Sequence, residues 1–178
     1  MKTTLKAWPF IAAVTIGLCF LTQGVARLFG IDLPDQEQMA TVRAYLLHAF
    51  DSPKALLTVA ILLLQVLLLA PALEETIFRW AGWRLPARLL LRGKAAATWA
   101  VAAVSSAAFV AAHYVDYAAL AAGGGFKWLP LSNAFLALFF FGLAQCWLYR
   151  KTGRIWCPML NHFLFNLTNL VLLLVLPQ

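Results

Sequence analysis

Residues 55–79 read ALLTVAILLLQVLLLAPALEETIFR. Apart from Thr58, Gln65 and Pro71, every residue before the first glutamate is apolar. An α-helix needs about 20 such residues to cross the roughly 30 Å of hydrocarbon in a bilayer. The stretch therefore predicts a transmembrane helix that carries two adjacent carboxylates close to the membrane interior, where ionisable groups are costly and usually functional.

The rest of the chain has the same character. Of its 178 residues, 63% are hydrophobic and 12% are charged, and the mean hydropathy is +0.80. A soluble domain of this size could not bury so much apolar surface. The net charge of +7 comes from basic residues at the ends of apolar runs, so it indicates membrane topology and not nucleic-acid binding.

We predict an all-α, polytopic transmembrane helix bundle forming one domain over residues 1–178. A short interfacial helix around 39–50 is expected between the first two crossings, because apolar residues recur there at steps of three or four. A kinked, interfacial end to the second crossing is expected over 80–91. About five spans are expected, with uncertain ends: 8–29, 56–84, 97–122, 129–149 and 155–176.

The basic residues set the expected orientation. They form three groups, before the first span, after the second and after the fourth, which five crossings place on one side: Lys2 and Lys6; Arg84, Arg88, Arg92 and Lys94; Arg150, Lys151 and Arg154. By the positive-inside rule the N-terminus lies inside and the C-terminus outside. The small, Ala- and Leu-rich chain suggests a bacterial cytoplasmic (inner) membrane.

The two glutamates of the opening stretch have different neighbours. Glu75 and Arg79 are spaced i,i+4 in the acid-first order that favours an ion pair on a helix. Glu74 is turned about 100° away on that helix, so it lacks this partner and is free for chemistry. The alternative is that both carboxylates only mark the end of the helix at the lipid headgroups.

Two further apolar helices carry histidines. His113 follows Phe109 by four residues among small side chains, and His162 precedes Asn166 by four, so each couple lies on one helix face. A lone histidine in such a helix is often a hydrogen-bonded packing residue, and asparagine often bonds between helices. Because three apolar helices of one chain carry such polar residues, a site shared by all three is favoured.

Chain distances support that convergence. Glu74 and His113 flank a predicted hairpin whose midpoint lies near 93–94, so both can reach a similar depth. With His162 and Asn166 they provide an acid, two imidazoles and an amide. That set suffices for water-dependent peptide hydrolysis without a serine or cysteine nucleophile.

These three motifs resemble those of the CAAX protease and bacteriocin-processing family, also called the Abi or type II CAAX prenyl endopeptidase family. Its pattern is EExxxR, then FxxxH, then HxxxN or HxxxD. All three occur here in order: Glu74-Glu75 to Arg79, Phe109 to His113, and His162 to Asn166. The resemblance covers about residues 56–176.

The resemblance implies an intramembrane endopeptidase of glutamate type. Glu74 with His113 would activate a water, and His162 with Asn166 would stabilise the oxyanion on the scissile carbonyl. Glu75 and Arg79 would form a structural pair. No cofactor is expected; the alternative is Zn²⁺ held by Glu74, His113 and His162, although the HExxH arrangement is missing and asparagine is a poor zinc ligand.

The expected substrate is a membrane-tethered protein or peptide. It would be cleaved at a leader, at a C-terminal sorting or anchor segment, or at a CAAX-like tail. Two alternatives remain open: a non-catalytic immunity or scaffold protein of the same fold, and a small proton-coupled transporter. The sequence makes no prediction of the oligomeric state.

Overall fold

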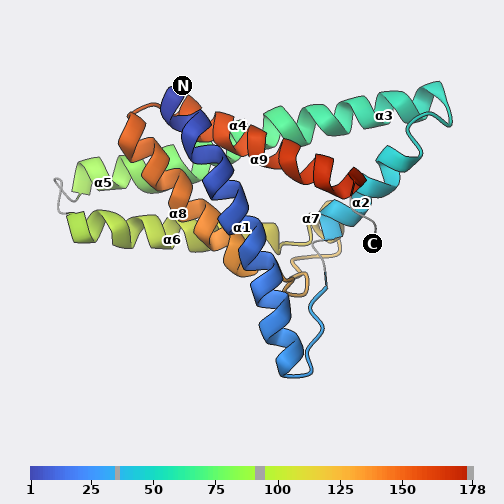
Figure 1. Ribbon diagram of the computed structural model, residues 1–178, viewed down its shortest axis with the longest axis horizontal. Helices are drawn as coiled ribbons and strands as arrows, with labels where there is room; N and C mark the ends of the chain where they lie inside the picture. The colour runs from blue at the N-terminus through green and yellow to red at the C-terminus, as the bar shows by residue number, and fades with distance from the viewer. Residues whose placement is uncertain (35–36, 91–94, 176–178) are drawn as a thin grey trace.

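The computed structural model describes residues 1–34, 37–90 and 95–175, with the backbone alone for 37–40 and 90, and these residues form helices and connecting loops without a strand. Figure 1 shows their arrangement. In chain order the elements are α1 (Lys2–Leu28), α2 (Glu37–Leu47), α3 (Pro53–Leu64), η1 (Gln65–Leu69), α4 (Ala70–Glu74), η2 (Glu75–Arg84), α5 (Leu85–Leu90), α6 (Ala95–His113), α7 (Tyr117–Ala121), α8 (Phe135–Thr152) and α9 (Trp156–Val175), where η marks a π-helix.

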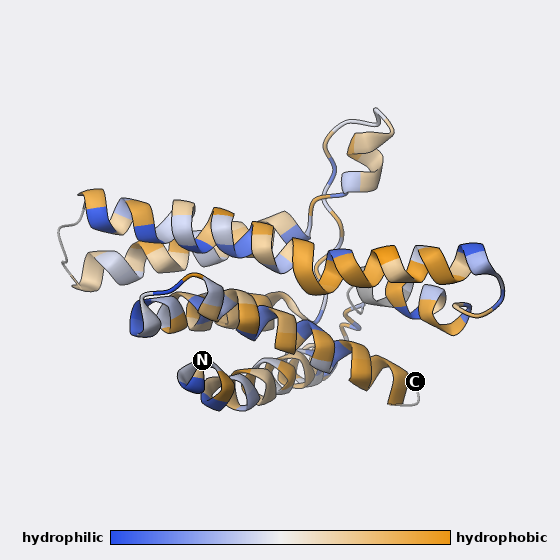
Figure 2. Ribbon diagram, turned by 90° about the horizontal axis from the view of Figure 1, so that it is seen from above, coloured by the Kyte–Doolittle hydropathy of each residue, from blue (hydrophilic) through white to orange (hydrophobic). Residues whose placement is uncertain are grey.

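Within the part of the chain that the structure describes, four helices are long and apolar enough to cross a membrane: Lys2–Leu28, Pro53–Leu89, Ala95–His113 and Trp156–Val175. This confirms an all-α, polytopic helix bundle. The second of these is one continuous stretch of 37 residues from α3 into α5, and the interfacial placement of its end stays a prediction. Apolar residues predominate along α3 and η1 and along the C-terminal half of α9 (Figure 2).

The helix α8, expected as the fourth of five spans, is not one of those four. Its 18 residues include Gln145 and end in Arg150 and Lys151, which lower its hydropathy. It packs against α1, α6 and α9, and α1 runs obliquely across it in Figure 1. The fully buried Gln145 lies on the side of α8 that faces these neighbours, while Leu136 and Trp147 are exposed.

The predicted third span, 97–122, is too long. The helix α6 ends at His113, and the chain then forms an isolated bridge between Val115 and Trp128. Asp116 caps the separate short helix α7 by accepting a hydrogen bond from the backbone N–H of Ala119 at 2.8 Å. Through these contacts, backbone groups after His113 find hydrogen-bond partners outside α6. The helix therefore ends at His113 although the following segment is apolar.

The two π-helical segments have backbone carbonyls that accept hydrogen bonds from other helices. Ser105 of α6 donates to the Phe78 carbonyl in η2, and Asn166 of α9 donates to the Val66 carbonyl in η1 at 2.8 Å. An unpartnered carbonyl in hydrocarbon costs several kcal/mol. Side chains from α6 and α9 thus stabilise the irregular stretches of the long second helix.

The crossing of α6 and α8 depends on a glycine. A Cβ placed on Gly142 would lie 2.8 Å from Oγ and 2.9 Å from Cβ of Ser106. We expect Gly142→Ala to destabilise the fold by about 1–3 kcal/mol through overpacking. Equilibrium unfolding in detergent measures this loss.

The matched control is Gly17→Ala on α1, where a Cβ meets no atom within 4 Å. It should leave stability unchanged or raise it by up to about 1 kcal/mol, as alanine is the better helix former. The double change Gly142→Ala with Ser106→Gly should recover stability, since it removes the two closest atoms. Equal losses for Gly142→Ala and Gly17→Ala would contradict the packing argument.

The N-terminus, the start of α6 and the turn from α8 to α9 lie toward the same end of the structure in Figures 1 and 2. The helix ends next to the three predicted basic groups therefore lie toward one end of the structure. This agrees with the grouping inferred from the sequence, while the N-in, C-out orientation and the bacterial inner membrane stay predictions.

Candidate active site

The predicted pair of Glu75 and Arg79 is present at the start of η2. The Nε of Arg79 lies 3.3 Å from Oε2 of Glu75, and both side chains are fully buried. A buried ion pair needs further partners to offset the cost of desolvation. Glu75 has one, because its Oε1 lies 3.0 Å from Nδ1 of His162 on α9. Glu75 thus joins the second crossing to the last one.

The Arg79 guanidinium is held mainly by aromatic rings. Its Nη atoms make no hydrogen bond with any described residue. Its central carbon lies 4.6 Å from the ring centroid of Phe109 and 5.9 Å from that of Phe78. A cation above a desolvated ring is stabilised by the ring quadrupole. Phe109 of the FxxxH motif therefore supports the arginine of the EExxxR motif.

His162 lies between the two adjacent glutamates. Besides the contact of its Nδ1 with Glu75, its Nε2 lies 3.8 Å from Oε2 of Glu74. The edge of the ring packs against Phe141 of α8, with centroids 4.9 Å apart. The Glu74 side chain is 27% exposed whereas that of Glu75 is fully buried, so of the two carboxylates Glu74 is the one that reaches the molecular surface.

His113, the last residue of α6, lies beside this group. Its Nδ1 is 2.9 Å from the carbonyl oxygen of Phe109, and the two rings are in contact at 4.5 Å. A hydrogen bond from Nδ1 to that carbonyl leaves Nε2 as the acceptor in the neutral imidazole. The ring of Phe109 also lies 6.3 Å from that of His162, centroid to centroid. Both histidines therefore lie beside the Phe109 ring, and His162 is also next to Glu74.

Asn166, predicted as an oxyanion donor, lies on α9 and bonds to the backbone of η1. Its Nδ2 donates to the Val66 carbonyl, which has no partner within its own helix. The N–H of Ala70 bonds to Gln65 in the π pattern, and the next residue, Pro71, has no N–H. One of the two amide protons of Asn166 is thus used to satisfy the backbone of η1.

One comparison identifies the family. The model of the type II CAAX prenyl endopeptidase Rce1-like family matches residues 55–168, well over half of the chain. The chain belongs to this family. Comparison with curated proteins and with solved structures gives no match. Membership supports a CAAX-type intramembrane endopeptidase at the level of the family, and the match contains the three motifs described above.

A zinc ion at this site would take Glu74, His113 and His162 as its ligands. The described residues contain no group of three His, Cys, Asp or Glu side chains arranged to hold a metal ion. Among the proposed ligands, His162 has its Nδ1 beside Glu75, and His113 has its Nδ1 against a backbone carbonyl. Both bonds leave the Nε2 atom of the ring available, as in metal-binding histidines, so they do not argue against zinc, and the metal-free site stays a prediction.

Other polar and aromatic residues lie near the site, among them Asn161, whose sequence context makes it a candidate for a hydrogen bond between helices. The ring of Phe141 packs against the imidazole of His162. Nothing in the Phe-rich sequence around Phe141 distinguishes it from its neighbours, so this contact could not be predicted. Gln145 and Asn161, both fully buried, join α8 to α9: the Asn161 amide donates to Gln145 at 3.1 Å, and Gln145 donates to the Pro158 carbonyl. Their partners lie on another helix, which explains why spacing alone could not reveal the pairing.

Proposed function

We propose that this protein is an intramembrane endopeptidase of glutamate type, in which Glu74 and His113 activate the hydrolytic water. The observation that carries the proposal is the difference between the two glutamates. Glu75 is fully buried between Arg79 and His162, whereas Glu74 is partly exposed beside His162, and His113 lies against the same Phe109 ring as His162. A general base needs access to water and a neighbour that shares the proton.

The reaction would run as follows at these side chains. Glu74 accepts a proton as the water oxygen attacks the scissile carbonyl carbon, and the carbonyl π electrons move onto oxygen. The tetrahedral intermediate then collapses, the C–N bond breaks, and the proton passes to the leaving nitrogen. His113, whose Nε2 is an acceptor in the neutral ring, assists the base by holding the proton in transit.

His162 is the proposed donor to the oxyanion. A protonated ring donates from both nitrogens, so Nδ1 can bond to Glu75 while Nε2 faces the reacting group beside Glu74. Glu75 would act as a positioning residue, because its bond fixes the orientation of the imidazole. Donors fixed in a water-poor site stabilise developing negative charge most strongly.

Asn166 has a second proton that could serve the oxyanion, besides the one bonded to Val66. Asn166→Ala should destabilise the fold by about 1–3 kcal/mol, the cost of an unpartnered buried carbonyl. If Asn166 also contacts the oxyanion, cleavage should fall by about 10²–10³-fold. Unfolding midpoints and cleavage rates measured on the same preparation separate the two effects.

A second change isolates the structural part. Pro71→Ala restores a backbone N–H that can bond to the Val66 carbonyl in the π pattern. In that background Asn166→Ala should cost less stability, while any loss from the oxyanion role should persist. Equal stability losses in both backgrounds would argue against the helix-repair role.

The proposed substrate is a membrane-tethered protein or peptide, cleaved in a leader, a C-terminal sorting or anchor segment, or a CAAX-like tail. The test is cleavage of such peptides by the full chain reconstituted in liposomes, followed by mass spectrometry, with and without a chelator. Cleavage that survives the chelator and fails in His113→Ala and His162→Ala supports the glutamate-type mechanism. Loss on chelation that Zn²⁺ restores would replace it with a metal-dependent one.

A further inference from the structure

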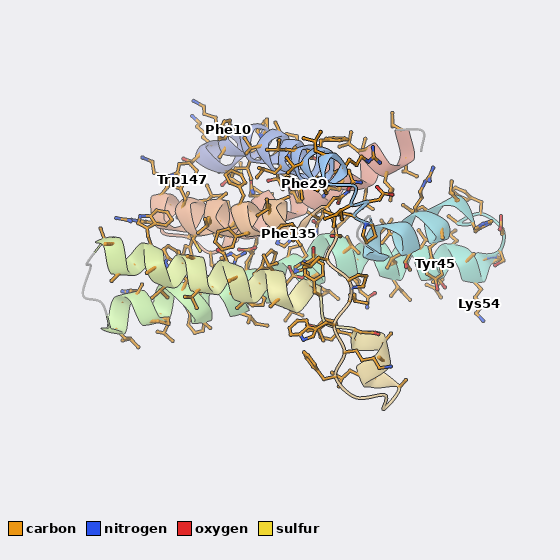
Figure 3. The ribbon with its side chains drawn as sticks, turned by 90° about the horizontal axis from the view of Figure 1, so that it is seen from below. Phe10, Phe29, Tyr45, Lys54, Phe135 and Trp147 are labelled. Atoms are coloured by element: carbon orange, nitrogen blue, oxygen red, sulfur yellow. The ribbon has the colours of Figure 1, made fainter. Side chains whose placement is uncertain are left out.

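The structure has an apolar groove that lies apart from the candidate active site. A groove of about 700 Å³ runs between α1, α6 and α8, and it shares no residue with the catalytic cluster. Its walls are mostly apolar and include Phe10, Trp99, Leu143 and Trp147. Figure 3 shows Phe10 and Trp147 near the same end of the molecule. The volume is within the range of roughly 300–1,000 Å³ that is common for ligand sites.

The charges at this groove are all of one sign. Two of the described lining residues, Lys2 and Lys6, are basic, and none is acidic. A third cation lies next to it, since the guanidinium carbon of Arg150 is 5.7 Å from the ring centroid of Trp99. A ligand that matches the site therefore has an apolar body and an anionic end.

We propose that the groove binds a phospholipid with an anionic headgroup. The acyl chain would lie along Phe10 and Leu143, and the headgroup phosphate would meet Lys2 and Lys6. Tryptophan side chains favour the boundary between headgroups and hydrocarbon, and basic pockets between membrane helices bind anionic headgroups. The proposal does not rest on proteolysis, because lipid binding to the groove is measured without a cleavage assay.

The experiment is native mass spectrometry of the full chain in detergent, titrated with dioleoyl phosphatidylglycerol, with dioleoyl phosphatidylcholine, and with glycerol phosphate as the headgroup without chains. We expect a single adduct with phosphatidylglycerol at concentrations that give little adduct with the other two. Equal binding of both lipids would overturn the role of charge. Binding of glycerol phosphate alone would overturn the role of the apolar groove.

Variants locate the headgroup. Lys2→Gln with Lys6→Gln should weaken phosphatidylglycerol binding by roughly 10- to 30-fold, since each cation beside an anionic headgroup contributes a factor of about five. Lys2→Arg with Lys6→Arg keeps the charges and should keep the affinity.

The matched control removes two exposed lysines elsewhere, Lys54→Gln with Lys127→Gln, and should leave binding unchanged. Lys54 lies at the far end of the molecule from Trp147 in Figure 3. Equal weakening by the control pair would show a nonspecific charge effect. A dimer without bound lipid would assign the groove to a second copy of the chain. Either result would overturn the proposal.

Discussion

Glu74→Gln is expected to lower the cleavage rate of a membrane-tethered substrate by about 10²–10⁴-fold, the usual contribution of a general base. The amide keeps the size of the side chain and removes the group that accepts the proton. Because the Glu74 side chain is partly exposed and its Oε2 is 3.8 Å from His162, the fold should survive the change. Initial rates in liposomes, with unfolding midpoints on the same preparation, measure both effects.

The matched control is Asp51→Asn, which makes the same chemical change in the exposed turn before α3, where Asp51 contacts His48 at 2.8 Å. It should leave cleavage unaltered. Glu74→Asp retains a carboxylate but shortens the side chain by one methylene. Its cleavage rate should therefore lie between those of wild type and Glu74→Gln. Full activity in Glu74→Gln would remove this residue from the mechanism and leave its contact with His162 as a structural one.

The parts of the fold that hydropathy governs could be predicted from the sequence. Lipid requires long apolar helices with internally satisfied backbones, so α1, the helix from α3 to α5, α6 and α9 were all indicated by composition. The pair Glu75 and Arg79 was predicted for a similar reason, because spacing on one helix determines it. Spacing along one helix and the hydropathy of the residues are enough to predict features of this kind.

The sequence predicted that polar residues of three helices share a site, but not which side chains on different helices contact one another. Spacing placed Glu74 about 100° from Glu75 and left it without a partner. In the structure one imidazole contacts both, since the two nitrogens of His162 lie on different edges of the ring. The bond from Asn166 to Val66 depends on a carbonyl left unpaired beside Pro71, and Pro71 was the only local sign of it.

Arg79→Met is expected to destabilise the protein by about 3–5 kcal/mol, because it leaves a buried carboxylate without its cation. The methionine fills much of the same space, so the loss would come from charge and not from a cavity. Equilibrium unfolding of the full chain by titration with a denaturing detergent measures it. The corresponding surface change, Arg27→Met, breaks an exposed contact with Asp32 and should cost about 1 kcal/mol or less.

A double variant separates charge from packing. Glu75→Gln with Arg79→Met has neither buried charge, and the glutamine oxygen can still accept from Nδ1 of His162. It should therefore be more stable than Arg79→Met alone, as removing both members of a buried pair costs less than removing one. If the double variant is as unstable as the sum of the single ones, the ring contact between Arg79 and Phe109 would account for the stabilisation instead.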